Sequence, residues 1–232
     1  MPVENARNRS PLLRSSLVVA AIGGFVSSAS AAPGAPLAPA VKVADGHALD
    51  LAANPSGDFV TAWTSANAKT DVRVRRYAAS GAARGIATTV AAKTTIFPLH
   101  DDNVAIGNAS NGAFTVGWAD NTGLHARRYG VDGAATGPAF LVDGASTQYS
   151  DLSMNATGDS AWAWRGAGQQ AYVRLYAADG SARGSTFVIP AAGAETTFES
   201  PQVAALHGSD CVVAWSLGAT SSAVYVQRFS GS

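Results

Sequence analysis

The chain has 232 residues, of which 47% are hydrophobic, so it is long and apolar enough for one folded domain and is not wholly disordered. It carries 16 basic and 16 acidic side chains, and its formal net charge at pH 7 is zero. A neutral chain lacks the electrostatic attraction that dominates binding to nucleic acid and to anionic membranes, and we expect neither as a partner.

Residues 1–31 are typical of a secretory signal peptide. Three arginines precede an apolar run at residues 17–26, and small residues follow at 29–31. The apolar run is shorter than a membrane span, and no later run approaches that length. The sequence therefore predicts a secreted or periplasmic protein without a membrane span after signal removal, whose mature domain covers residues 32–232. An uncleaved N-terminal anchor is the alternative.

The mature sequence contains four copies of one repeat. Each copy has an apolar run that ends in tryptophan, and a second run that ends in another aromatic residue. The tryptophans are Trp63, Trp118, Trp164 and Trp215, and the second aromatic residues are Tyr77, Tyr129, Tyr176 and Phe229. Each copy predicts four short strands, and such units of roughly 40–50 residues are typical of the blades of a β-propeller. The expected repeats are 47–100, 101–149, 150–199, and 200–232 together with 36–46.

The last copy ends after only three predicted strands. The missing strand is predicted within residues 36–46, because Pro39 to Gly46 is similar to Pro138 to Gly144, the fourth strand of the second copy. The sequence thus predicts an all-β, four-bladed β-propeller closed by an N-terminal strand that completes the last blade, in a monomer. Two alternatives remain. Four blades could form an open arc that pairs with a second chain into an eight-bladed ring, or the strands could form a sandwich.

The repeat resembles a family of repeats in secreted bacterial proteins, with the pattern Gly-x-Phe-Val-Val-x-Trp followed by Gln-Arg-Phe. Gly57 to Trp63 and Gln227 to Phe229 carry this pattern here. The resemblance covers nearly all of the mature chain and implies an extracellular, propeller-like module, but no particular activity. Two departures concern Leu175, where the other copies have arginine, and the turn between the first two strands of the second copy, which is expected to be longer.

One polar residue is expected just before the first strand of each copy. These residues are Asp50, Asn103, Asp151 and Gln202. In a propeller this position lies beside the central channel, so two carboxylates and two amides would converge at the channel mouth. They could hold a hard cation such as Ca²⁺ or a polar ligand. The alternative is that they cap turns through local backbone hydrogen bonds. We expect no cofactor, with Ca²⁺ as the one candidate.

Catalytic signatures are missing from the sequence. The four histidines lack metal-ligand spacing, and there is no nucleophile elbow or phosphate-binding loop. The single cysteine, Cys211, excludes an internal disulfide and is predicted to be a buried thiol. Arginines recur in the third strand and are expected to pack between blades. We therefore expect a secreted, non-catalytic module that binds a glycan or surface polymer through its rim or channel mouth. An extracellular protein-interaction scaffold and a hydrolase or lyase with acids at the channel mouth are the alternatives.

Overall fold

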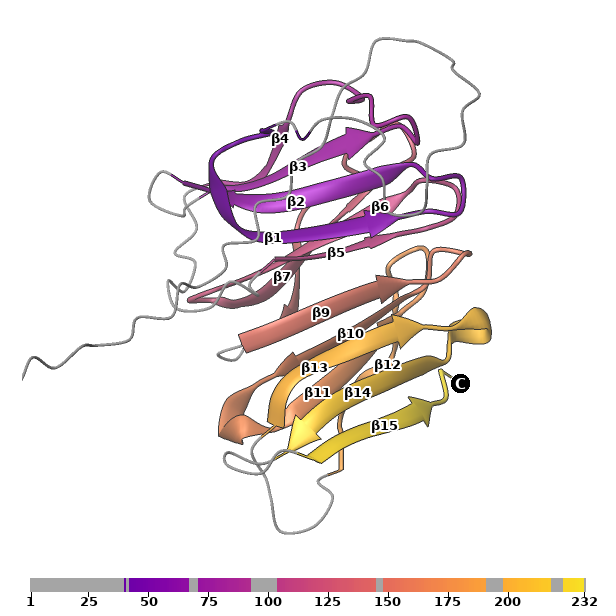
Figure 1. The fold of residues 1–232 in the computed structure, drawn as a ribbon. Helices are drawn as coiled ribbons and strands as arrows, with labels where there is room; N and C mark the ends of the chain where they lie inside the picture. Colours follow the sequence, from indigo (N-terminus) through magenta and orange to yellow (C-terminus); the bar gives the residue numbers. More distant parts are fainter. Residues whose placement is uncertain are drawn as a thin grey trace, which may run out of the picture.

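The computed structural model describes residues 40, 42–66, 71–92, 104–144, 148–190, 198–217 and 223–231. Their strands form antiparallel sheets that follow one another in chain order, from the indigo strands at the top of Figure 1 to the yellow strands at the bottom. The prediction of an all-β fold is confirmed. Within the described ranges, no helix is long and apolar enough to cross a membrane. The predicted signal peptide lies outside the described residues.

Each sheet is a meander in which strands adjacent in sequence are adjacent in space. The first sheet contains β1 (Gly46–Ala53), β2 (Phe59–Ser65), β3 (Val72–Tyr77) and β4 (Thr88–Ala91). The second contains β5 (Val104–Asn108), β6 (Phe114–Asp120), β7 (Gly123–Tyr129) and β8 (Phe140–Asp143). The third contains β9 (Gln148–Met154), β10 (Ser160–Arg165), β11 (Ala171–Tyr176) and β12 (Ala182–Val188). The fourth contains β13 (Phe198–Ala205), β14 (Cys211–Leu217) and β15 (Ala223–Phe229).

In the first and third sheets, the turn between the first two strands is built from asparagine and glycine. In the first sheet, the side-chain oxygen of Asn54 accepts hydrogen bonds from the amide and hydroxyl of Ser56, at 3.1 and 2.7 Å. Asn155 makes the same contacts to Thr157 in the third sheet, at 3.0 and 2.8 Å. Gly57 follows at φ 84°, a conformation that glycine adopts without steric cost. This local chemistry closes the hairpins that position β1 and β9.

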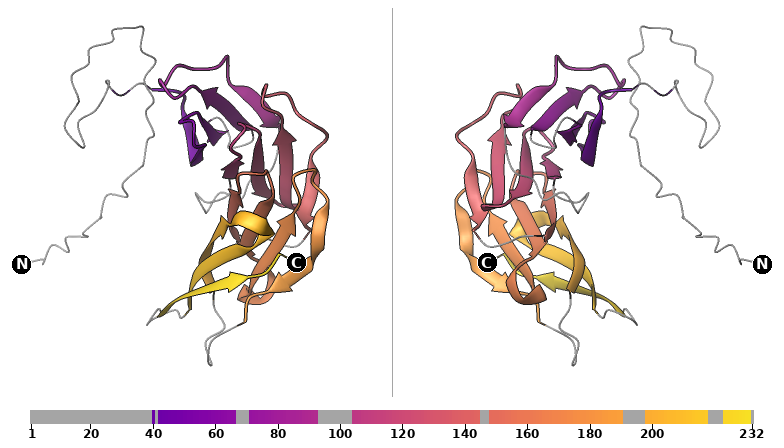
Figure 2. Two further views of the ribbon diagram at one scale, coloured as in Figure 1. Left: turned by 90° about the vertical axis from the view of Figure 1, so that its right-hand side faces the viewer. Right: turned by 90° about the vertical axis from the view of Figure 1, so that its left-hand side faces the viewer.

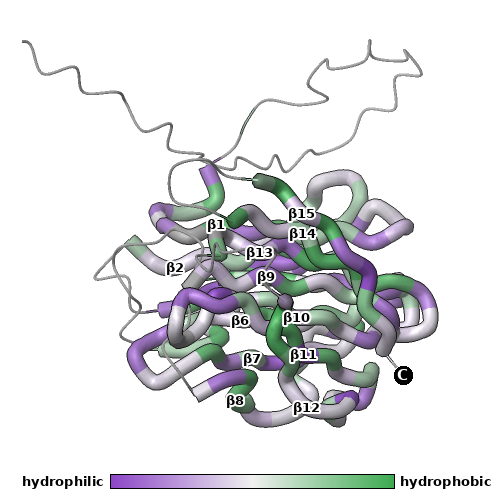
Figure 3. Tube along the Cα trace, turned by 90° about the horizontal axis from the view of Figure 1, so that it is seen from below, coloured by the Kyte–Doolittle hydropathy of each residue, from purple (hydrophilic) through white to green (hydrophobic). Residues whose placement is uncertain are grey.

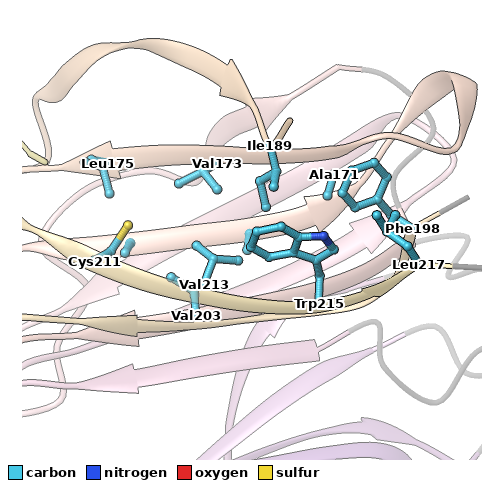
Figure 4. Close-up of a cluster of buried hydrophobic side chains, with 12 residues drawn as sticks. Ala171, Val173, Leu175, Ile189, Phe198, Val203, Cys211, Val213, Trp215 and Leu217 are labelled. Atoms are coloured by element: carbon cyan, nitrogen blue, oxygen red, sulfur yellow. The ribbon is translucent and has the colours of Figure 1, made fainter. Parts of the chain in front are cut away.

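Successive sheets pack face to face through equivalent side chains. In the second, third and fourth sheets, the tryptophan of the second strand faces the preceding sheet: Trp118 packs with Val60 and Ala62, and Trp215 packs with Ala163. The residue before the tryptophan is small and faces the following sheet. Figure 4 shows the last of these contacts, where side chains of β11 and Ile189 meet Trp215 and its neighbours from the fourth sheet. The same two-sided pattern therefore produces three successive cores.

The third-strand arginines bind between sheets, as predicted. Arg127 donates to the carbonyl of Val90 in the preceding sheet at 3.2 Å, and Arg174 donates to the carbonyl of Val142 at 3.0 Å. Because these carbonyls lie at outer strands, the arginines join the periphery of one sheet to the next. The prediction that Cys211 is buried is also confirmed.

The sheets form an open arc whose ends are the first and fourth sheets (Figure 2). The fourth sheet contains three strands, and β15 is its last strand in the part of the chain that the structure describes. Residues 40 and 42–46 of the predicted closing strand do not pair with β15, and residues 36–39 and 41 lie outside the described ranges. Ring closure within one chain is therefore not seen in the described structure.

The pairing of β5 corrects the alignment of the second repeat. Leu51 pairs with Thr61, two residues before a tryptophan, and Ile106 pairs with Val116 in the same position. Ala105, and not Asn103, is thus the equivalent of Asp50. The turns 54–58 and 109–113 have equal length, so the predicted longer turn is wrong. A shift of two residues keeps every side chain on its face, which is why the alternation of the strand did not reveal it.

Candidate functional site

The first strands of the four sheets lie side by side along the concave side of the arc, in the order β1, β5, β9, β13. A hollow of about 260 Å³ lies against β1, β5 and β9, and Val203 of β13 completes its lining. A second hollow of about 350 Å³ lies at the end of these strands, against the turns that lead to the second strands. Ala53, Asn108 and Met154 line both hollows, so the two form one continuous concave region.

Two carboxylates of the predicted ring line the first hollow. Asp50 accepts hydrogen bonds from the amides of Leu51 and of Ile106 in the next sheet, both at 2.7 Å. Asp151 accepts one from the amide of Val203 in the next sheet at 2.6 Å, and another from its neighbour Leu152. Each aspartate thus ties the backbone of its own strand to that of the following sheet. The contacts to Leu51 and Leu152 are local, whereas those to Ile106 and Val203 reach the following sheet, so neither aspartate acts only as a local turn cap.

Burial changes the acidity of both groups. It raises the pKa of Asp50 to about 6, against the opposing effect of the two amide donors, and the charge of Asp151 adds to the rise. Burial raises the pKa of Asp151 as well. A carboxyl of this kind changes its charge near neutral pH, because withdrawal from water disfavours the ionised form.

The rest of the predicted ring is incomplete. Gln202 occupies the position equivalent to Asp50 in the fourth sheet, and its amide donates to the carbonyl of Pro201 at 3.3 Å. Asn103 lies outside the described residues, and Ala105 provides no polar side chain at its place. In the described part of the chain, no group of three or more His, Cys, Asp or Glu side chains is placed to hold a metal ion. The donor set around Asp50 and Asp151 therefore offers two carboxylates that are already bound to amides.

The second hollow, here called the turn hollow, contains polar groups that the sequence reasoning missed. Its lining includes Ser110, Thr157 and His207, beside the apolar side chain of Met154. The side-chain oxygen of Asn108 is buried at its edge, and no donor in the described residues lies within hydrogen-bonding distance of it. The recurring Asn-x-Ser/Thr triplet of these turns was the available signal.

Residues of all four sheets line the turn hollow. Asn108 donates to the carbonyl of Ala52 in the first sheet at 3.5 Å, and Asn155 donates to the carbonyl of Leu206 after the fourth sheet's first strand at 3.1 Å. Amides thereby fix the relative positions of the turns. Hydroxyl, amide and imidazole groups around an apolar patch can bind a neutral, hydroxyl-rich ligand.

No family model matches the chain, and no curated protein matches its sequence. Solved structures share a propeller-like all-β fold with it at low sequence identity. A variant of the Aleuria aurantia lectin in complex with Fucα1-6GlcNAc has a TM-score of 0.51 and 11% identity, covering 81% of this chain and 63% of the lectin. A Dyadobacter fermentans protein of unknown function has a TM-score of 0.51 and 10% identity, covering 80% of this chain and 65% of its own. This chain thus spans less than two thirds of the length of either protein.

Proposed function

We propose that this chain is a secreted, non-catalytic binding module that recognises a glycan or another surface polymer at the mouth of the concave region. The turn hollow carries this proposal. It presents amide, hydroxyl and imidazole groups from successive repeats, and an apolar surface beside them. Its volume of about 350 Å³ is that of a small-ligand site, on the scale of one or two sugar rings.

Three further observations support the proposal. The predicted signal peptide and the resemblance to repeats of secreted bacterial proteins favour an extracellular or periplasmic location. The zero net charge disfavours nucleic acid as a ligand. The solved structures of similar fold include a lectin with a bound fucoside, although the likeness to this chain extends to the fold alone.

We also propose that the four sheets are the four blades of one propeller-type scaffold. The supporting observation is that each sheet repeats the same register between its first two strands. Leu51, Ile106, Leu152 and Val203 each pair with the residue two positions before a tryptophan. The equivalent turns therefore all lie at the same ends of the first strands, where the turn hollow lies.

Calorimetric titration of the mature protein with a glycan panel tests the binding proposal. The panel includes Fucα1-6GlcNAc and α-methyl-L-fucoside. For any glycan that binds, His207→Ala should weaken the affinity roughly three- to tenfold, the value of one hydrogen bond. His47→Ala is the matched control, because His47 lies at the start of β1, at the opposite end of that strand from the turns. A panel without binders would count against the proposal, and equal effects of both variants would exclude the turn hollow as the site.

A hydrolase or lyase is the second candidate, and the raised pKa of Asp50 favours it. An acid with a pKa of about 6 beside a second carboxyl can donate a proton near neutral pH. Assays of the bound glycans for cleavage, with wild type and with Asp50→Asn, test this candidate. Turnover that Asp50→Asn abolishes would support it, whereas turnover that persists in this variant would exclude Asp50 as the acid.

A further inference from the structure

The open face of the fourth sheet carries valines that are buried everywhere else in the repeat. Val72 and Val74 of β3 are 0% and 3% exposed, because they pack against the second sheet. The equivalent residues of β15, Val224 and Val226, are 80% and 69% exposed. Figure 3 shows this first half of β15 as an apolar stretch. We call the face that carries Val212, Ala214, Val224 and Val226 the tail face.

The equivalence of these residues rests on strand register. Val74 pairs with the residue before Trp63, and Val226 pairs with the residue before Trp215. Ala126 and Val173 occupy the same position in the second and third sheets, and both are fully buried by the sheet that follows. Only the last member of the series lacks a following sheet among the described residues. Its exposure is a consequence of that position.

A complementary face lies at the other end of the arc, and its first strand is partly exposed. Leu51 of β1 is 43% exposed, whereas the equivalent residues Ile106, Leu152 and Val203 are buried against the preceding sheet. We call the face of the first sheet that carries Leu51 the head face. Thr61 and Trp63 of the same face are 2% and 6% exposed, so the exposed part of the head face is its first strand. Every internal contact joins a tail-type face to a head-type face, and the exposed valines of the tail face match the exposed leucine of the head face in chemistry.

The fourth sheet also has an arginine at a position whose arginine, in the first and second sheets, donates hydrogen bonds to the next sheet. Arg76 donates to the carbonyls of Val131 and Asp132, in the turn after the third strand of the second sheet. Arg128 donates to the carbonyl of Ala178 in the same turn of the third sheet. Arg228 holds the equivalent position in the fourth sheet and pairs with Asp210 of its own sheet at 2.6 Å. The corresponding turn that a following first sheet would offer contains Ala79.

A strand added to the edge of β15 would not cover the tail face, because side chains project from the faces of a sheet and not from its edge. The tail face requires a whole sheet. We propose that this sheet is the first sheet of a second copy of the chain, whose tail face packs in turn on the head face of the first copy. The two ends of one arc lie apart (Figure 2), so a second copy supplies what one chain does not.

Two such contacts are related by a two-fold axis and close a ring of eight sheets. A head-to-tail contact forms a closed ring when its rotation returns to the start, and otherwise continues into a filament. Closure leaves neither face exposed, so association stops at two chains. The concave regions of the two copies then line one common channel.

Sedimentation equilibrium of the mature protein tests the proposal, with an expected mass of two chains. Val226→Asp and Leu51→Asp should each give folded monomers, because each removes one partner of both contacts. Burial of a single valine or leucine is worth about tenfold or more in the association constant, and a buried aspartate adds to the loss. Ile86→Asp is the matched control, since Ile86 is exposed outside both faces. Circular dichroism and thermal unfolding establish that each variant is folded.

Mixing the two variants separates a head-to-tail contact from a symmetric one. The tail face of Leu51→Asp and the head face of Val226→Asp are both intact, so the mixture should form a dimer through one contact while each variant alone stays monomeric. A wild-type protein that remains monomeric up to about 1 mM, a range in which weak association is still measurable, would overturn the proposal. So would a mixture that fails to associate, or a dimer that neither substitution weakens.

Discussion

The pH dependence of stability should report the burial of Asp50. Its pKa rises from an ordinary 3.8 to about 6 in the folded protein, chiefly because of burial. The folded state therefore holds this proton more tightly than the unfolded state does. The contribution of Asp50 to stability is greatest below pH 3.8, falls as pH rises, and is lost above pH 6. At 1.36 kcal/mol for each pH unit between the two values, the reduction is about 3 kcal/mol at most.

Asp50→Asn removes this titration while keeping the size of the side chain. At neutral pH the substitution relieves the cost of a buried charge, but asparagine has a single acceptor oxygen for the amides of Leu51 and Ile106, which bond to different oxygens of Asp50. One amide is left without its acceptor, at a cost of about 1–3 kcal/mol. The two effects nearly cancel at pH 7. At pH 4 the wild-type carboxyl is uncharged, so the variant gains nothing from charge removal and should be less stable, relative to wild type, than it is at pH 7.

Urea unfolding of both proteins from pH 4 to pH 8 measures this difference. The free energy of unfolding of wild type relative to Asp50→Asn should decrease by about 2–3 kcal/mol over this range, with most of the change between pH 4 and 6. Asp151 titrates in both proteins, and its own effect largely cancels in the comparison. A difference that is constant with pH would refute the claim that burial raises the pKa of Asp50. A difference that grows with pH would mean that the pKa of Asp50 is lowered in the folded protein.

Two further predictions concern the cores between sheets. Gly117→Ala should destabilise the protein by about 1–3 kcal/mol in urea unfolding, because the new Cβ would lie 2.5 Å from the buried ring of Trp162; Gly137→Ala, which meets nothing within 4 Å, should be neutral. Burial raises the pKa of Cys211 to about 11, with the charge of Asp210 adding to the rise, so a thiol reagent at pH 8 should react only as fast as the protein opens. Rapid stoichiometric labelling of the native protein would contradict the latter.

Most of the strand order could be read from the sequence because tryptophan marks one position in every repeat. Trp63 and its three equivalents are bulky and lie on the same face of their sheets, the face that meets the preceding sheet in the second to fourth sheets. The tryptophan therefore sets the register of the second strand. The aromatic residue at the end of the third strand sets the register of the third strand against the second. Tyr77 stacks on Phe59, and Tyr129 on Phe114, with ring centroids 4.8 and 4.6 Å apart.

The candidate site was harder to predict because the first strands lack such a marker. In β5 small and apolar residues occupy both faces, so a register two residues away satisfies the same pattern. That ambiguity placed Asn103 where the structure places Ala105. The sequence also did not show that Asp50 and Asp151 join successive sheets. Each accepts a hydrogen bond from an amide of the following sheet, more than 50 residues away in sequence. The turn hollow depends on the same long-range arrangement.

The number of sheets in the proposed ring depends on the angle between successive sheets, which a repeat pattern does not specify. A strand that completes the last sheet needs the same residue pattern whether it comes from the same chain or from a second chain. The angle is limited where sheets approach closely, and here they do so at the second strands. Gly117 lies directly against Trp162, and Ala163 occupies the same small-residue position in the contact that Trp215 makes. A ring of four sheets must turn a quarter circle at each contact, which requires wide separation at the outer strands. Outer strands that are instead joined by direct hydrogen bonds, such as Arg127 to Val90, favour a smaller turn and a ring of more than four sheets.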